Sequence, residues 1–171
     1  MPVVIDPAQL PEDRPVIEAL FTAYLGFLRE RVPEHWQKIS SKYPIERVPE
    51  LVSGYLLENA RPTGEILIAR LDGKPVGCAM MRQTEPGIVE IQRVYVAPEA
   101  RGHGIGKDLT LRLMALARKD GQRIMRLDTG PALTEAIGLY RSLGFRERTA
   151  YHSDYEALEG ILVYFEADLL A

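Results

Sequence analysis

Three glycines at alternate positions lie between a strand-like and a helix-like segment, and this turn constrains the fold more than any other feature. The turn reads Arg101-Gly102-His103-Gly104-Ile105-Gly106. Apolar residues at helical spacing follow it, namely Ile105, Leu109, Leu113 and Leu116. The start of a helix offers unpaired N–H groups and the positive end of the helix dipole, and glycines let an anion approach closely. The sequence therefore predicts a phosphate-binding turn, to which Arg101 and Lys107 could add positive charge.

Other known phosphate-binding turns fit this segment poorly. A P-loop requires Ser or Thr after its lysine, but Asp108 follows Lys107. The dinucleotide-binding fingerprint has the spacing G-x-G-x-x-G, whereas this turn has G-x-G-x-G. The structural alternative is a turn whose glycines only permit a tight connection. The flanking basic residues and the helix start favour an anion site over that alternative.

The strand before this turn, at residues 88–96, contains a slip in its alternation. Val89 and Ile91 are apolar at odd positions, whereas Val94 and Val96 are apolar at even positions. A period of two that shifts by one residue is typical of a β-bulge, which we expect near residues 92–94. A strand buried on both faces would also lose its alternation and is the alternative. A bulge would bend the strand and leave backbone groups free for a ligand.

The order of the remaining elements predicts an α/β fold with a mixed sheet. The signal Asp72-Gly73-Lys74 predicts a hairpin between two strands, and helices and strands alternate after residue 96. The expected strands are residues 3–5, 66–69, 76–81, 88–96, 123–127 and 161–165, and the expected helices are 15–31, 104–119 and 134–143, with further helical pieces between 33 and 60.

Length and composition favour one domain that spans residues 1–171. A net charge of −3 gives no electrostatic reason to expect a nucleic-acid partner. Cys78 is the single cysteine, which favours a reducing compartment. The first residues have neither a basic region nor a long apolar run, so we expect no signal peptide and no membrane span. The expected location is cytoplasmic.

Two motifs resemble those of the GCN5-related N-acetyltransferase (GNAT) family. The glycine turn matches the signature R/Q-x-x-G-x-G/A, and Val94-Tyr95-Val96-Ala97-Pro98 precedes it at the expected distance. Downstream, a helix containing Tyr140 ends in Leu143-Gly144-Phe145, which is similar to the second family motif. The resemblance covers residues 65–165. It implies an α/β, GNAT-like mixed, largely antiparallel central sheet with a bulged, splayed strand and helices on both faces.

The resemblance also implies acetyl-CoA, or a related acyl-CoA, as co-substrate. Backbone groups of Val94 and Val96 would bind the pantetheine arm, and amides of the glycine turn would bind the diphosphate. Leu133 departs from the family pattern, because many members carry a cofactor-contacting asparagine at this place. The implied cofactor-binding residues are Val94, Tyr95, Val96, Arg101, Gly102, His103, Gly104, Ile105, Gly106 and Lys107.

The implied reaction transfers an acetyl group to a primary amine of a small molecule or peptide, by direct attack through a tetrahedral intermediate. Tyr140 falls on the family's usual general acid, and Glu90 corresponds to the base of histone-modifying members. From spacing alone Tyr140 could equally be a core tyrosine, and Glu90 could be a solvated strand residue. The segment joining strand and turn is shorter than in those members, which weakens the Glu90 correspondence. The alternative function is a CoA-binding sensor without turnover.

The acceptor leaves few signals in the sequence. An acidic stretch with Asp154, Glu156 and Glu159 would favour a cationic acceptor if it borders the cleft, and residues 36–55 could form another wall. Nothing marks Cys78 as an activated nucleophile, so we expect a buried thiol. We expect no metal site, because His103 has no companion ligands nearby in the sequence. Dimers are common among proteins with this resemblance, so a homodimer is one expected arrangement.

Overall fold

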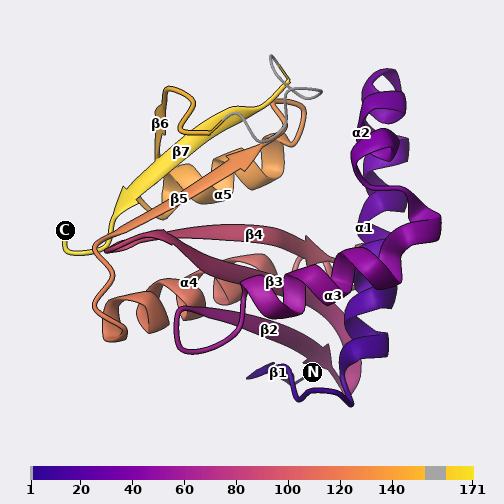
Figure 1. Ribbon diagram of the computed structural model, residues 1–171, viewed down its shortest axis with the longest axis horizontal. Helices are drawn as coiled ribbons and strands as arrows, with labels where there is room; N and C mark the ends of the chain where they lie inside the picture. The colour runs from indigo at the N-terminus through magenta and orange to yellow at the C-terminus, as the bar shows by residue number, and fades with distance from the viewer. Residues whose placement is uncertain (1, 153–160) are drawn as a thin grey trace.

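A computed structural model describes residues 2–152 and 161–171 of the chain (Figure 1). Its strands are β1 (Val3–Pro7), β2 (Gly64–Leu71), β3 (Lys74–Glu85), β4 (Ile88–Val96), β5 (Ile124–Thr129), β6 (Arg146–Arg148) and β7 (Val163–Asp168). Its α-helices are α1 (Arg14–Arg31), α2 (Trp36–Lys42), α3 (Val48–Glu58), α4 (Ile105–Lys119) and α5 (Thr134–Ser142), and its short 3-10 helices are η1 (Pro33–His35), η2 (Ile45–Arg47) and η3 (Pro98–Ala100). The elements follow the predicted order, and the predicted bounds of β4 are confirmed. Among the described strands, β6 was not predicted, because its three residues carry no apolar pattern. The short helix η3 was not predicted either.

The strands form one sheet in the order β1-β2-β3-β4-β5-β7-β6. Neighbouring strands are antiparallel except β4 and β5, which run parallel. The β4–β5 pairing is confined to Ile88–Glu90 and Ile124–Arg126. Beyond it the two strands diverge, so that β5 and β7 lean away from β4 (Figure 1). The predicted mixed, largely antiparallel and splayed sheet is confirmed.

The predicted bulge in β4 is also confirmed. Cys78 of β3 faces Tyr95, and Met80 faces Gln92, so β3 advances by two residues where β4 advances by three. The extra residue lies at Arg93, whose φ of 54° is in the left-handed region that a non-glycine residue rarely adopts. The bulge interrupts the regular pairing of β4 with β3, in a part of β4 that no longer pairs with β5. Backbone groups on this stretch of β4 therefore border the splay.

Helices cover both faces of the sheet (Figure 1). On one face, Ile17 of α1 and Val52 of α3 pack in one buried cluster with Ile68 of β2. On the other face, α4 buries Leu109 and Leu113 in a second cluster that includes residues of β4 and β5. Because the apolar stripe of α4 faces this core, the start of α4 is held against the end of β4.

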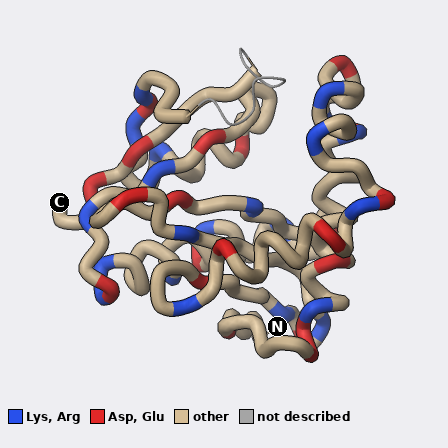
Figure 2. The backbone as a smooth tube through the Cα atoms, in the orientation of Figure 1, with Lys and Arg blue, Asp and Glu red and all other residues tan. Residues whose placement is uncertain are grey.

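Basic and acidic residues are interspersed along the backbone rather than collected on one element (Figure 2). The net charge of −3 is therefore not concentrated on one helix or strand. Within the described ranges, no helix combines the length and the hydropathy that crossing a bilayer requires.

Candidate active site

A cavity of about 490 Å³ opens where β4 and β5 diverge. Its described lining comes from α1, η1, α2, β4, the end of β5, α5 and the residues just before β7. Among the residues predicted from the sequence, the lining includes Glu90, Val94, Tyr95, Val96, Arg101, Gly106 and Tyr140. The structure thus brings both predicted catalytic residues and much of the predicted cofactor site to one cavity.

The glycine turn has the backbone that the sequence predicts. Gly102 has a φ of 84° and Gly104 a φ of 72°, so both adopt the left-handed conformation that glycine allows at little cost. Gly104 is the residue before α4, and its carbonyl accepts a 3.0 Å hydrogen bond from the N–H of Asp108. The first N–H groups of a helix have no carbonyl partner within that helix. At the start of α4 they could therefore hold an anion, beside the positive end of the helix dipole.

Two side chains of the turn, those of Arg101 and His103, contact other parts of the chain. Arg101 donates from Nε to the carbonyl of Val96 at 3.3 Å, and its guanidinium lies over the ring of Phe27 at 4.8 Å. His103 Nδ1 lies 3.0 Å from the carbonyl oxygen of Ala100. Arg101 therefore ties the turn to α1 in this structure.

Leu133 lies at the start of α5 and lines the cavity with its buried side chain. The atoms that an added Cβ on Gly130 would meet belong to Leu133. An apolar surface thus occupies the place where the family pattern has a polar side chain.

Tyr140 lies in the cavity wall and is 6% exposed. Its ring packs edge-on against Phe145, with the centroids 5.6 Å apart. Burial, with smaller contributions from Tyr24 and the carboxylate of Asp128, raises the pKa of Tyr140. Its hydroxyl therefore stays protonated at neutral pH and can donate.

Glu90 is a buried carboxylate rather than a solvated strand residue, with 4% of its surface exposed. Tyr151 donates its hydroxyl to Glu90 Oε2 at 2.7 Å, and the amide of Gln92 donates to Oε1. The guanidinium of Arg82 lies 3.4 Å from Oε1. These partners compensate the cost of burying the charge. Burial and the nearby carboxylates of Glu90 and Asp128 raise the pKa of Tyr151.

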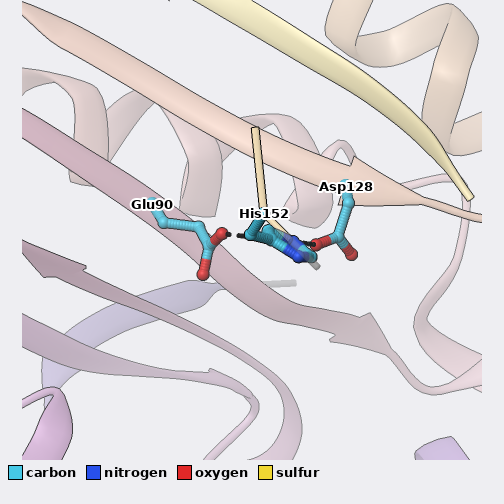
Figure 3. Close-up of side chains that lie close together, drawn as sticks. All are labelled: Glu90, Asp128 and His152. Atoms are coloured by element: carbon cyan, nitrogen blue, oxygen red, sulfur yellow. Dashed lines mark hydrogen bonds and ion pairs between the residues drawn. The ribbon is translucent and has the colours of Figure 1, made fainter. Parts of the chain in front are cut away.

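His152 lies between Glu90 and Asp128, which come from β4 and β5 (Figure 3). Its Nε2 is 2.6 Å from Asp128 Oδ2 and 3.9 Å from Glu90 Oε2. The three residues offer donor atoms within 4.8 Å of one another, an arrangement that could hold a cation. The sequence prediction did not find this cluster, because His152 is far from both carboxylates along the chain and belongs to no motif.

The other sequence predictions have mixed outcomes. Cys78 is buried as expected, and burial raises its pKa to about 12. Tyr43, within the segment proposed as a second wall, lines the cavity. The predicted acidic stretch with Asp154, Glu156 and Glu159 lies outside the described residues.

Comparison with known proteins gives a consistent result. The model of the acetyltransferase (GNAT) family matches residues 25–145. An IAA acetyltransferase of Azospirillum brasilense is 41% identical over 90 residues, which are 52% of this chain and 59% of that protein. An uncharacterized N-acetyltransferase of Schizosaccharomyces pombe is 31% identical over 71% of this chain and 76% of its own length. The PaiA N-acetyltransferase of Thermoplasma acidophilum, solved in complex with coenzyme A, superposes with a TM-score of 0.72 at 20% identity, covering 98% of this chain and 99% of that one.

Proposed function

Because the chain belongs to the acetyltransferase (GNAT) family, we propose that it is an N-acetyltransferase that uses acetyl-CoA. The acceptor in this proposal is a primary amine of a small molecule or peptide. The observation that carries the proposal is the cavity between β4 and β5, which joins the bulge of β4 to the start of α4 and to Tyr140. This geometry can hold a long acyl carrier with a phosphate group at one end and a reacting carbonyl at the other.

The cofactor would lie along the splay. Its diphosphate would accept hydrogen bonds from the amides of residues 102–107, which gather at the start of α4. Its pantetheine arm would pair with backbone groups of Val94 and Val96, beside the bulge. Structures of similar proteins that contain coenzyme A or acetyl-CoA support this co-substrate.

The first chemical requirement is an unprotonated amine. A primary amine with a pKa of about 10.4 loses its proton at neutral pH at a cost of roughly 4.6 kcal/mol. Glu90 would accept this proton, directly or through one water molecule, because its carboxylate borders the cavity and its negative charge is held by Arg82. Gln92 would fix the orientation of that carboxylate through its hydrogen bond to Oε1.

The amine nitrogen then attacks the thioester carbonyl, and negative charge grows on the carbonyl oxygen. A backbone N–H at the bulge, such as that of Val94, would stabilise this charge. When the C–S bond breaks, the sulfur takes a proton from the hydroxyl of Tyr140 and leaves as free CoA. The attacking nitrogen gives up its extra proton as it becomes the neutral amide, and water would return that proton to the Tyr140 oxygen. Burial raises the pKa of Tyr140, so its hydroxyl still carries the proton when the C–S bond breaks.

The relatives support the reaction type more than the acceptor. The match to the IAA acetyltransferase spans 59% of that protein, and the other reported relative has no named acceptor. The single cysteine supports a cytoplasmic location in this proposal. A homodimer and a one-domain organisation over residues 1–171 remain parts of the proposal.

The experiment is an acceptor screen with acetyl-CoA that follows free CoA thiol with a disulfide reagent. Acceptor-dependent thiol release, with an acetylated amine identified by mass spectrometry, is the expected result. Saturable binding of CoA with no thiol release from any amine would contradict catalysis and favour a sensor. Absence of CoA binding would contradict the cofactor assignment itself.

A further inference from the structure

We propose that the acceptor occupies the α1–α2 side of this cavity, with an apolar body against that wall and its ammonium at Asp128. This inference rests on the proposed N-acetyltransferase function and names the class of its acceptor. Alkylamines and arylalkylamines fit this description, whereas polyamines, amino sugars and acidic amino acids do not.

The α1–α2 wall of the cavity is mostly apolar. Val32 and Ile39 are both 7% exposed and form a small cluster of their own, separate from the two larger cores. This cluster packs against Ile161 and Leu162, which come immediately before β7. The apolar part of the described lining here consists of Leu25, Phe27, Leu28, Val32, Ile39, Tyr43, Ile161 and Leu162. Glu34, which is exposed, and His35 line the same side of the cavity. A hydrophilic acceptor would lose hydration against this wall without gaining hydrogen bonds, whereas an apolar body would gain by being buried.

Among the carboxylates of the described lining, Asp128 is partly exposed and also lies in one cluster with Glu90, whereas Glu34 and Glu135 do not belong to that cluster. Asp128 lies on β5 in the lining, and its side chain is 22% exposed, compared with 5% for that of Glu90. Glu90 already accepts hydrogen bonds from Tyr151 and Gln92. Asp128 uses Oδ2 for its 2.6 Å contact with His152, which fixes the position of the carboxylate. An ammonium at Asp128 would lie close to Glu90, the proposed proton acceptor, because atoms of both carboxylates lie within 4.8 Å of each other.

The two arginines of the described lining contact other parts of the chain. Arg93 donates to Gln92 Oε1 at 2.6 Å, and its guanidinium lies 3.3 Å from the centre of the Tyr55 ring. Arg101 donates to the carbonyl of Val96. An acceptor carboxylate at this end of the cavity would be repelled by the carboxylates of Glu90 and Asp128, so the cavity favours an amine without an acidic group.

The first test compares acceptors of similar amine basicity that differ in their bodies, using the wild-type protein. We expect kcat/KM for 2-phenylethylamine and hexylamine to exceed that for ethanolamine by about tenfold or more, because each buries an apolar body. Spermidine and glutamate should be poorer still. Equal or better turnover of ethanolamine, spermidine or glutamate would overturn the acceptor assignment while leaving the acetyltransferase function intact.

The second test measures binding without turnover. A quaternary analogue, N,N,N-trimethyl-2-phenylethylammonium, cannot be acetylated, and its affinity for the CoA-loaded protein can be measured by calorimetry. We expect Asp128→Asn to weaken this binding and to raise the KM for 2-phenylethylamine by about tenfold, with unchanged CoA affinity. Asp6→Asn, on the exposed edge strand β1, is the matched control and should change neither value.

The two tests separate the two proposals. Binding of the quaternary analogue that depends on Asp128, with no turnover of any amine, would support the acceptor site and contradict catalysis. Analogue binding that is equally strong in Asp128→Asn would overturn the role of Asp128, even if 2-phenylethylamine is acetylated.

Discussion

Gly104 and Gly121 flank the two ends of α4, and both have a positive φ, of 72° and 84°. A Cβ atom added to either residue would have no described heavy atom within 4 Å. The two positions therefore share the same backbone strain and the same open space. They lie at opposite ends of α4, and only Gly104 is at the helix start, where a diphosphate would bind.

Replacing Gly104 by leucine should lower the affinity for CoA by about tenfold or more, since the side chain would stand where the phosphate approaches the amides. Gly121→Leu should leave the affinity unchanged. Both variants should lose about 1–2 kcal/mol of stability, because an L-residue in this conformation is strained. Calorimetric titration with CoA and thermal unfolding give both quantities. Equal affinities in the two variants would argue against the turn as the phosphate site.

Tyr140→Phe should lower kcat by roughly 100-fold, because the departing sulfur loses its proton donor. The affinity for CoA should stay within about twofold, since the aromatic ring and its packing on Phe145 are retained. Tyr55→Phe serves as the control, because Tyr55 is also buried but lies outside the described lining of the cavity. Unchanged kcat in Tyr140→Phe would remove this hydroxyl from the mechanism.

Glu90→Gln keeps the shape of the side chain and removes the proposed proton acceptor. We expect kcat to fall by about 100-fold with little change in CoA affinity. Glu58→Gln is a close control, because Glu58 also pairs with Arg82, at 3.3 Å, but lies on the exposed face of α3. If both variants have the same activity, the carboxylate of Glu90 serves the structure through Arg82 and Tyr151 rather than catalysis.

Cys78 should react very slowly with a disulfide reagent in the native protein. Burial raises its pKa to about 12, so at pH 8 only about one thiol in ten thousand is ionised, whereas an ordinary cysteine is substantially ionised. Reactivity should rise with pH towards 12 and should appear at once when the protein is unfolded. A stoichiometric reaction of the native protein at pH 8 within minutes would contradict the buried thiol. Slow reaction also keeps the background low in the acceptor screen.

Local patterns predicted most of the fold. The bounds of β4 and the place of its bulge followed from the shift between Ile91 and Val94, because alternation reports which face each side chain occupies. The left-handed conformation of Arg93 was not predictable, since the residue itself does not require it. The strand β6 was missed because it is held by pairing with β7 rather than by its own sequence.

The residues proposed for the cofactor could be found in the sequence, whereas those proposed for the acceptor could not. The glycine turn and Tyr140 lie in short motifs that resemble those of the GNAT family. The contacts among Glu90, Asp128 and His152 form only when β4, β5 and the segment before β7 come together, so no local pattern records them. The apolar wall was not predicted for the same reason, because Val32 and Leu162 become neighbours only in the folded chain.

The most direct measurement of the central claim is a crystal structure of the protein with bound acetyl-CoA. The account predicts the diphosphate on the amides of residues 102–107, the pantetheine arm beside Val94 and Val96, and the thioester near Tyr140. Cofactor density in another place, with the splay between β4 and β5 filled by side chains, would contradict it.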